Sequence, residues 1–405
     1  MTRDRRPTAR DPYGILPGAS LAAPLLAAAG LVVVALLTVG LFNGRLVTLL
    51  VPGRPGDGGA AGATPAPSNV VITNPQASVA GSVVYVKAGN LWLQTGTDTR
   101  QLTGTGHDSM PTWSPDGQWL YFIETRTGTG HFPGQDGVTD YRLTYPIVER
   151  IRPDGSGRQE LLSGLYHSGG GAYTWFSWYR QPAVSPDGRT LALVSDAPDP
   201  TRQDVVLQFL DLATKKLSLA PISENAPLGH QDPAWRPDGK AVAFVMNAHD
   251  GAKGTPTIDV YDLATKKVRT VSGPGYTNPS WSPDGRYIAA TRTGLFGTDV
   301  VILDAATGRE LIQITGDGRS WSPTWSPAGD ELIYMHLAGQ IVDLKLVKLG
   351  GTAPGWTLAE QVDLTEQSGL DGASKAAWYI PADQLPSPTP AAPSGAAASA
   401  SAPPS

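Results

Sequence analysis

One short phrase occurs five times in this chain, and it constrains the fold more than any other feature. The copies read PTWSPDGQWLYFIE, PAVSPDGRTLALVS, PAWRPDGKAVAFVM, PSWSPDGRYIAATR and PTWSPAGDELIYMH, and they begin at Pro111, Pro182, Pro233, Pro279 and Pro323. Three tryptophans of the phrase, at positions 235, 281 and 325, follow one another at intervals of 46 and 44 residues. A repeat of about this length is typical of proteins built from similar supersecondary units.

Each copy predicts a tight turn followed by a buried strand. In SPDG, serine opens the turn, proline fixes φ at the second position, and glycine adopts dihedrals that other residues avoid. The apolar runs that follow, such as WLYFI and AVAFV, suit a strand that is covered on both faces. Two further strand-like segments then flank a turn such as LATKK. We therefore expect four antiparallel strands in each repeat, which is one blade of a β-propeller.

The two ends of the repeated region predict the number of blades. Residues 82–104 supply three strands without a preceding SPDG strand, whereas residues 364–381 repeat the approach to a first strand and then stop. The C-terminal strand should therefore complete the N-terminal blade. The prediction is an all-β, six-bladed β-propeller over residues 79–382, whose closure removes the open sheet edges that favour aggregation.

The repeated P-x-W-S-P-D-G followed by an apolar strand resembles the TolB-type β-propeller family. The resemblance extends over nearly the whole predicted propeller and implies that fold. Other members are the propeller domains of prolyl oligopeptidases and dipeptidyl peptidases. TolB carries a mixed α/β domain before its propeller, and the stretch that precedes Ser82 here is too short for one. The resemblance therefore does not transfer the partners typical of TolB.

The N-terminal region predicts one transmembrane helix. Residues 19–42, ASLAAPLLAAAGLVVVALLTVGLF, contain no charged side chain, and a membrane-spanning helix needs roughly 20 apolar residues. Four arginines lie in residues 1–18 and two follow the apolar segment, which predicts a cytoplasmic N-terminus and an extracytoplasmic propeller at the cell membrane. The alternative is a cleaved signal peptide, whose apolar region is normally shorter and followed closely by a cleavage site.

Composition limits the remaining segments and the classes of partner. Residues 43–78 and 383–405 are rich in Pro, Gly, Ala and Ser, and we expect a flexible linker and a disordered tail. The absence of cysteine excludes disulfides, a thiolate metal site and a cysteine nucleophile. A net charge of −5, without a run of Lys or Arg in the propeller, argues against a nucleic-acid partner.

Catalytic motifs are not found in the sequence. There is no G-x-S-x-G elbow, HExxH, P-loop or dinucleotide-binding glycine pattern. The SPDG aspartates belong to different blades, and Ala328 takes their place in the fifth copy, so we assign them to turn geometry. We expect no catalytic residue and no cofactor. The alternative is an envelope enzyme, a metal-dependent hydrolase or lyase, with Asp108, His230 and Asp232 as ligands at the mouth of the propeller channel.

Binding has more support than catalysis. In propellers of this type the first strand of each blade starts beside the central channel, so the residues before each proline should ring the channel mouth. These positions are mostly polar or aromatic, and they differ from blade to blade. One residue before the proline, the row is Met110, Gln181, Asp232, Asn278, Ser322 and Lys375. Two residues before it, the row is Ser109, Arg180, Gln231, Thr277, Trp321 and Ser374. Three residues before it, the row is Asp108, Tyr179, His230, Tyr276, Ser320 and Ala373.

An insertion adds aromatic residues next to these rows. Seventy-one positions separate Trp113 from Val184, and the added sequence includes YHSGGGAYTWFSWYRQP. Aromatic residues and arginine are enriched in binding hot spots, although they could equally pack the insertion onto the propeller. The ligand-binding candidates are Asp108, Trp178, Tyr179, Arg180, Gln181, His230, Asp232, Tyr276, Asn278, Trp321 and Lys375.

The leading hypothesis is a membrane-anchored, extracytoplasmic β-propeller that acts as a binding scaffold for a protein, peptide or glycan at the envelope. The metal-dependent enzyme is the second hypothesis, and a purely structural spacer is the third.

Overall fold

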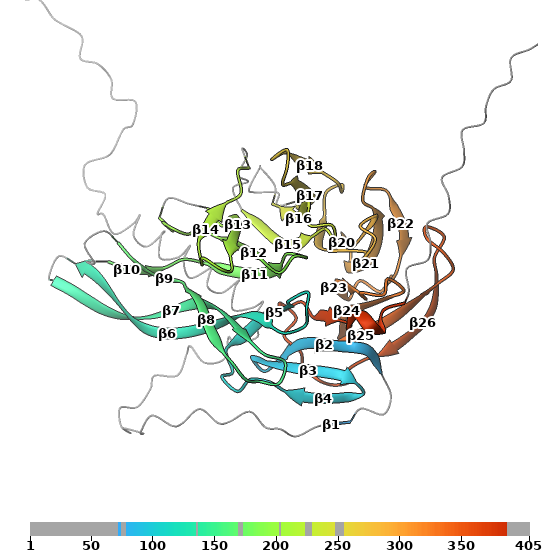
Figure 1. Cartoon of the computed structure of the whole chain (residues 1–405), viewed down its shortest axis with the longest axis horizontal. Helices are drawn as coiled ribbons and strands as arrows, with labels where there is room; N and C mark the ends of the chain where they lie inside the picture. The colour runs from blue at the N-terminus through green and yellow to red at the C-terminus, as the bar shows by residue number, and fades with distance from the viewer. Residues whose placement is uncertain are drawn as a thin grey trace, which may run out of the picture. The chain divides into compact units, whose positions relative to one another are not determined.

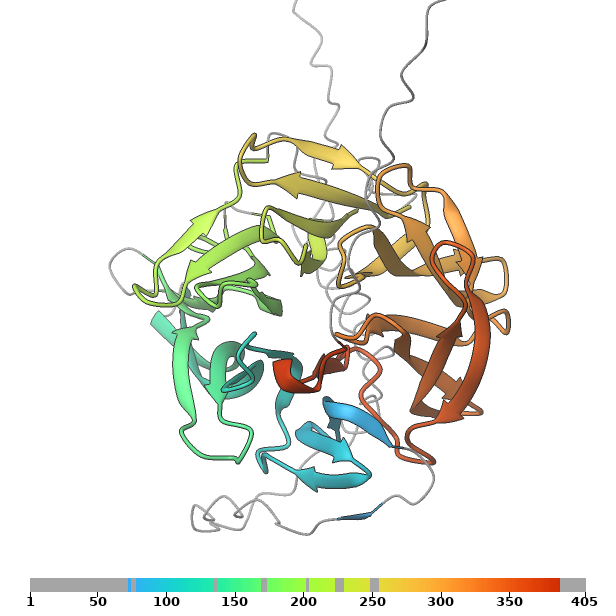
Figure 2. The ribbon, with the colours of Figure 1, turned by 45° about the vertical axis from the view of Figure 1, so that its right-hand side comes forward.

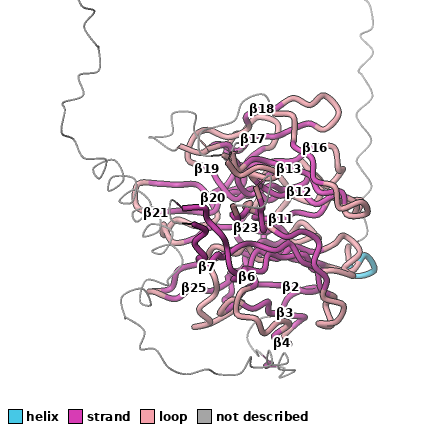
Figure 3. Tube along the Cα trace, turned by 90° about the vertical axis from the view of Figure 1, so that its left-hand side faces the viewer, coloured by secondary structure: helices cyan, strands magenta, loops and turns pink. Residues whose placement is uncertain are grey.

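The computed structural model describes residues 72–73, 78–134, 137–168, 173–201, 204–222, 229–247 and 255–386. Residues 1–18, the expected transmembrane helix at 19–42, and most of the linker and of the tail lie outside these ranges. The helical structure in the described ranges is one 3-10 turn, η1 (Ala382–Gln384), which is cyan in Figure 3. Within the same ranges, the chain contains no helix with the length and apolar character of a membrane span.

The strands form a six-bladed β-propeller, as the repeats predicted (Figure 2). Blade 1 contains β1 (Ile72–Thr73), β2 (Val79–Lys87), β3 (Asn90–Gly96), β4 (Asp98–Gln101) and β27 (Ala377–Tyr379). Blade 2 contains β5 (Asp108–Trp113), β6 (Leu120–Gly134), β7 (Gly137–Ile151) and β8 (Gln159–Ser163). Blade 3 contains β11 (Tyr179–Val184), β12 (Thr190–Ser195), β13 (Val206–Asp211) and β14 (Leu217–Leu219).

The last three blades repeat this pattern. Blade 4 contains β15 (His230–Trp235), β16 (Ala241–Met246), β17 (Thr257–Asp262) and β18 (Val268–Thr270). Blade 5 contains β19 (Tyr276–Trp281), β20 (Tyr287–Gly294), β21 (Gly297–Asp304) and β22 (Glu310–Gln313). Blade 6 contains β23 (Ser320–Trp325), β24 (Glu331–Ala338), β25 (Ile341–Gly350) and β26 (Thr357–Asp363). The first strands, β27, β5, β11, β15, β19 and β23, contact one another in succession and form the innermost ring.

Blade 2 carries the insertion that the sequence predicted. β6 and β7 are each 15 residues long, and their hairpin projects beyond the other strands of the blade (Figure 1). The connection to blade 3 contains a separate two-stranded sheet of β9 (Leu165–His167) and β10 (Thr174–Phe176). β10 contacts both strands of the long hairpin.

The alternation of strand direction gives the propeller two different faces. One face, here called the SPDG face, carries the SPDG turns between the first and second strands of each blade. The opposite mouth face carries the turns between second and third strands and the loops that lead into the next blade. These two kinds of segment contact each other, for example where the His230 N–H donates to the Val205 carbonyl at 2.8 Å. At Gly297, with φ of 139°, a Cβ would lie 1.9 Å from the Gly318 carbonyl oxygen, so glycine is required.

The SPDG aspartates hold the turns, as predicted. In the first copy, Asp116 accepts hydrogen bonds on Oδ1 from the Gln118 N–H at 3.0 Å and from the Ser114 hydroxyl at 2.5 Å. The Ser114 hydroxyl oxygen in turn accepts from the Trp119 N–H at 2.9 Å. The copies at Ser185 and Ser282 repeat this arrangement, so the acidic set has a local structural role.

The tryptophans of the phrase join neighbouring blades. Trp235 donates from Nε1 to the Ala183 carbonyl at 3.0 Å, and Trp281 donates to the Ala234 carbonyl at 3.1 Å. Each acceptor lies directly after the proline of the preceding blade. Trp113 makes the same contact with Ala377, at 3.3 Å. Trp325 departs from the pattern because its buried Nε1 has no hydrogen-bond partner among the described residues.

The ring closes as the sequence predicted. β27 pairs antiparallel with β2, and Trp378 lies opposite Val83. The indole Nε1 of Trp378 donates to the Ala80 carbonyl at 2.7 Å. One hydrophobic cluster contains Val83 and Trp378 from blade 1 together with Ile333 and Leu344 from blade 6. The main apolar contacts of the fold thus lie between blades, including between the first and the last.

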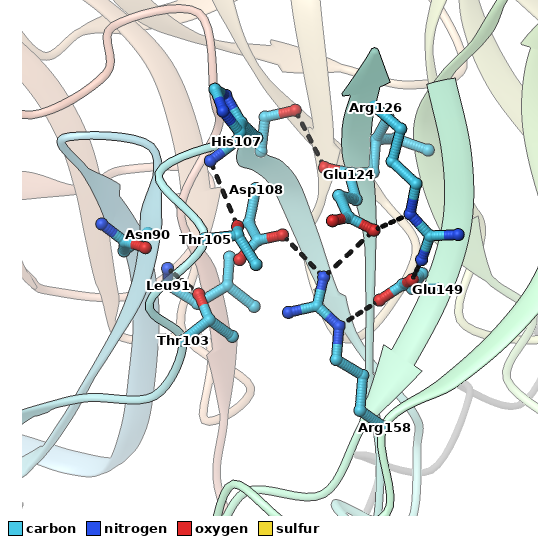
Figure 4. Close-up of polar contacts among 12 residues, drawn as sticks. Asn90, Leu91, Thr103, Thr105, His107, Asp108, Glu124, Arg126, Glu149 and Arg158 are labelled. Carbon is cyan, nitrogen blue, oxygen red and sulfur yellow. Dashed lines mark hydrogen bonds and ion pairs between the residues drawn. The ribbon is translucent and has the colours of Figure 1, made fainter. Parts of the chain in front are cut away.

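A charged cluster ties together the strands of blade 2 at the base of the long hairpin (Figure 4). Arg126 forms ion pairs with Glu124 at 2.7 Å, with Glu160 at 2.6 Å and with Glu149. Arg158 pairs with Asp108 at 3.0 Å, with Glu124 at 3.4 Å and with Glu149. The cluster therefore connects β5, β6, β7 and β8.

Two carboxyl groups of this cluster differ in their affinity for a proton. Burial and a hydrogen bond to Glu124 raise the pKa of Glu149 to about 7. Burial also opposes ionisation of Glu124, but the hydrogen bond from Arg126 and the charge of Arg158 outweigh it and lower the pKa of Glu124. The shared proton of this pair therefore resides on Glu149.

The inter-blade tryptophan contact gives a first prediction. Trp281→Phe removes a hydrogen bond and leaves the partly buried Ala234 carbonyl without its indole donor, so the free energy of unfolding should fall by about 1–2 kcal/mol. Trp325→Phe is the matched control, because it removes a buried N–H that has no partner, and its effect should be close to zero or stabilising. Urea unfolding of the full-length variants, followed by circular dichroism, measures both. Equal losses in the two variants would contradict the proposed role of the indole N–H.

The charged cluster gives a second prediction, on pH. The folded protein holds the proton of Glu149 more tightly than the unfolded chain does, so this group stabilises the fold fully at low pH. That contribution decreases as the pH rises through about 7. Glu149→Gln should therefore flatten the pH dependence of the melting temperature between about pH 4.5 and 7, whereas Glu160→Gln, at an exposed member of the cluster, should retain it. An unchanged slope in Glu149→Gln would contradict the assignment of the raised pKa to Glu149.

Candidate functional site

The residues directly before the five phrase prolines, together with Lys375 at the equivalent position of the C-terminal repeat, form a ring around the propeller axis, here called the axial ring. Five of its six members have positive φ: Met110 (54°), Gln181 (53°), Asp232 (50°), Asn278 (51°) and Ser322 (50°). Such φ values are uncommon outside glycine. In every case the register between the first and second strands of the blade shifts at this position, which is a β-bulge that redirects a side chain.

Hydrogen bonds connect the axial ring from one blade to the next. The Gln181 amide nitrogen donates to Oδ1 of Asp232, while its amide oxygen accepts from the Asp232 N–H at 3.0 Å. Asn278 donates from Nδ2 to Oδ2 of Asp232 at 2.9 Å. The Thr291 hydroxyl donates to the Asn278 side-chain oxygen at 2.9 Å and accepts from the Ser322 N–H at 2.9 Å. These contacts span blades 3, 4, 5 and 6.

The remaining side of the ring is joined through blades 1 and 2. The Gln181 N–H donates to the Met110 sulfur at 3.3 Å, and the Met110 N–H donates to the Ser374 hydroxyl at 3.2 Å. Lys375 donates from Nζ to the Pro279 carbonyl at 2.9 Å, on the other side of the axis. The residues one position before the prolines therefore lie together around the propeller axis, where the sequence predicts them.

Electrostatics in the axial ring favour the neutral forms of two groups. Asp232 and Lys375 are only partly exposed, and protein surrounds them on all sides of the axis. Burial raises the pKa of Asp232, against the opposing charges of Lys375 and Arg180. Burial lowers the pKa of Lys375 to about 8, against the attraction of Asp232. The ring can thus offer one carboxyl group, one amine and several amide and hydroxyl groups to a ligand, and the two titratable groups give up their charge more readily than they would in water.

Four of the six residues three positions before the prolines are buried: Asp108, Tyr179, His230 and Ser320. Asp108 lies in the charged cluster of blade 2 (Figure 4). His230 accepts on Nδ1 from the Leu207 N–H at 3.0 Å and packs on the ring of Phe244. Burial lowers the pKa of His230 to about 4, so its imidazole is neutral at physiological pH. These residues were expected at the mouth, and the structure places them in the core.

This placement corrects the metal site of the enzyme hypothesis. Asp108 is paired with Arg158, His230 is held by the Leu207 N–H, and Asp232 belongs to the axial ring. In the described part of the chain, no group of three or more His, Cys, Asp or Glu side chains is placed to hold a metal ion. The three proposed ligands therefore do not form one site.

Of the remaining ligand-binding candidates, some pack against other side chains and others are exposed to solvent. Trp321 donates from Nε1 to the Gly372 carbonyl at 2.8 Å and packs against the cluster that joins blades 6 and 1. Tyr276 donates its hydroxyl to Glu310 at 3.2 Å. Arg180, in contrast, is exposed, and its guanidinium makes no hydrogen bond or ion pair with any described residue. Its contact is with the ring of Trp178, whose centroid lies 5.8 Å away.

The insertion forms a row of aromatic rings that leads to Arg180, here called the aromatic row. Successive ring centroids lie 5.6, 6.2, 5.2 and 5.0 Å apart along Phe132, Tyr173, Trp175, Phe176 and Trp178. Phe132 is 52% exposed, Trp175 38% and Trp178 41%. The insertion therefore packs onto the long hairpin and also presents aromatic surface to solvent, which combines the two interpretations left open by the sequence.

Sequence reasoning missed two features of this region. The bulge at the axial ring has no signal beyond the shared position before proline, since the ring residues differ in every blade. The turn between β20 and β21 also went unnoticed, although its sequence, Gly-Leu-Phe-Gly, places two large apolar residues between glycines. Both of these side chains, Leu295 and Phe296, are 96% exposed.

Comparison with solved structures supports the fold. TolB from Acinetobacter baumannii is 20% identical with a TM-score of 0.52, and the match covers 74% of this chain and 66% of that one. A putative TolB from Agrobacterium tumefaciens is 16% identical with a TM-score of 0.51, over 76% of this chain and 96% of that one. The chain thus spans slightly less than two thirds of the Acinetobacter protein.

Sequence comparison points the same way. An uncharacterized protein of Agrobacterium fabrum is 27% identical over 157 residues, which are 38% of this chain and 44% of that protein. The family described as the TolB beta propeller domain matches residues 177–365, which comprise blades 3 to 6. The repeated SPDG phrase, the closed six-bladed ring and these matches together identify the fold as a TolB-like β-propeller.

Proposed function

We propose that this protein is a membrane-anchored binding scaffold whose propeller lies outside the cytoplasm and recognises a protein, peptide or glycan of the envelope on its mouth face. The supporting observation is the exposed pair of Trp178 and Arg180 between the aromatic row and the axial ring. Tryptophan and arginine are the residue types most enriched among binding hot spots.

Arg180 is the strongest element of this proposal. A guanidinium normally uses its donors in a fixed fork to bind carboxylate or phosphate groups. That of Arg180 stacks on Trp178 and leaves its donors uncommitted among the described residues, in contrast to Arg126 and Arg158, which are fully engaged in ion pairs. Arg180 is therefore held in place by a stacking contact and remains available to an anionic group of a ligand.

The membrane anchor rests on the sequence of residues 19–42 and on where the propeller begins and ends. β2 starts and β27 ends on the SPDG face, since these two strands run antiparallel in blade 1 and the Tyr379 hydroxyl donates to the Asp116 carbonyl of an SPDG turn at 3.3 Å. The described segment that precedes β2 is β1, which pairs with β4 at the outer edge of blade 1 and so away from the axial ring.

The third prediction tests this site in intact cells. Chemical crosslinking of the full-length protein, followed by mass spectrometry, should recover a specific partner, and Trp178→Ala or Arg180→Ala should reduce its recovery about tenfold or more, because truncating a hot-spot residue costs about 2 kcal/mol of binding energy.

Arg189→Ala provides the matched control, because Arg189 is an exposed arginine of an SPDG turn on the opposite face. This variant should recover the partner as the unmodified protein does. Partner recovery that stays unchanged in both Trp178→Ala and Arg180→Ala would show that the site is wrongly assigned. A full-length chain that fractionates without membranes would overturn the anchor.

A further inference from the structure

Large apolar side chains gather on one face of the propeller. Among the described residues, eight large hydrophobic side chains are exposed. Six of them lie in the hairpin turns or connecting segments of the mouth face: Phe132, Val138, Trp175, Trp178, Leu295 and Phe296. The other two, Leu219 and Leu358, lie on outermost strands of their blades. Exposed apolar residues that cluster in this way mark an interaction surface.

The six residues fall into two groups on opposite sides of the axis. The first group lies on the long hairpin of blade 2 and the adjoining connection to blade 3. The second, Leu295 and Phe296, forms the tip of the β20–β21 hairpin of blade 5. Blades 2 and 5 are three positions apart in a ring of six and therefore lie across the axis from each other (Figure 2). A ligand that contacts both groups must extend across the face.

The charges around the second group argue against a lipid surface. Membrane-binding segments combine apolar residues with flanking Lys or Arg, which attract anionic headgroups. No Lys or Arg occurs in residues 293–308, whereas the exposed Arg142 and Arg180 lie beside the first group. Arg292, which precedes the second tip, is engaged by Glu310 at 2.9 Å.

The chemistry of the second tip argues against a glycan. Sugars are recognised by flat aromatic faces together with polar groups, and an exposed leucine offers no such face. Leu295 and Phe296 are almost completely exposed in a turn whose flanking residues are glycines, so they can insert into an apolar pocket on a partner surface. Apolar anchors of this kind, with a polar rim, are characteristic of protein–protein contacts.

From these observations we propose that the mouth face is the docking surface for one folded protein, which contacts the tip of the β20–β21 hairpin and the aromatic row at the same time. The partner surface carries apolar pockets for these side chains and an anionic group that pairs with Arg180. This inference rests on the proposed binding function and specifies its ligand as a folded protein that spans the axis.

The experiment places a photoreactive benzophenone side chain at one position of the full-length protein in intact cells. Positions 296 and 175 report on the two apolar groups, and position 358 is the control, an exposed apolar position outside the mouth face. Irradiation should give a protein adduct of the same mass from positions 296 and 175, and no adduct of that mass from position 358.

Coupling between the two groups is the decisive measurement. Leu295→Ser combined with Phe296→Ser should reduce the adduct formed from position 175 about tenfold or more, because one partner would lose its second contact. Leu358→Ser, the matched polar substitution away from the face, should leave that adduct unchanged. Both variants alter only exposed side chains, so the melting temperature should stay constant and serves as the control for folding.

Other outcomes overturn the inference in distinguishable ways. An adduct at position 175 that persists unchanged in the double variant would leave the Trp178–Arg180 site intact and refute the spanning partner. Lipid adducts alone, or an adduct of twice the mass of the chain, would replace the partner with a membrane or a second copy. The absence of protein adducts from positions 175 and 296 alike would refute both this inference and the proposed function.

Discussion

The structure depends on contacts between blades, because a single four-stranded blade cannot bury both of its faces. Each hydrophobic cluster combines residues of neighbouring sheets, for example Ile258 and Val260 of blade 4 with Trp281 and Ile288 of blade 5. The repeated tryptophan adds a directional element, since its indole N–H reaches the carbonyl after the preceding blade's proline. Such an arrangement becomes complete only when the first and last blades also meet, and the pairing of β27 with β2 provides this final contact.

The same strands that close the fold also create the candidate site. A residue in the left-handed region costs of the order of 1–3 kcal/mol, and the axial ring contains five of them. Their side chains recover part of this cost through hydrogen bonds to neighbouring blades, such as that between Asn278 and Asp232. The bulge is therefore both a structural joint and the device that brings different polar groups to the axis. Because these groups are already paired with one another, the exposed Arg180 is better suited than the ring itself to capture a ligand.

Much of the fold could be predicted from the sequence, because repetition supplies information that a single strand lacks. Five copies of one phrase fix the turn, the strand that follows and the blade length, and the incomplete repeats at the two ends fix closure. The site was predicted less well for a physical reason. Side chains alternate between the two faces of a strand, and a bulge interrupts that alternation, so Asp232 and His230, two residues apart, lie at the axis and in the core respectively.

The charged cluster of blade 2 shows a second limit. Asp108 aligns with the other residues three positions before proline, and alignment alone placed it with them at the mouth. Its ion-pair partner, Arg158, lies 50 residues further along the chain, and Glu149, which also pairs with Arg158, lies 41 residues further along. No pattern in the sequence around Asp108 predicts these contacts. Their pairing follows from the long hairpin of the insertion, which brings a second arginine, Arg126, to the same place.

The two faces of the propeller differ in how much they vary among the blades of this one chain. On the SPDG face the same turn recurs with the same serine–aspartate hydrogen bonds. The residues of this turn therefore serve to end the first strand of each blade. On the mouth face the connections differ in length and chemistry in every blade, and only there do two hairpins present large apolar residues to water. Apolar exposure is unfavourable in water, and its concentration on one face among the described residues is the reason why the proposed binding surface is placed there.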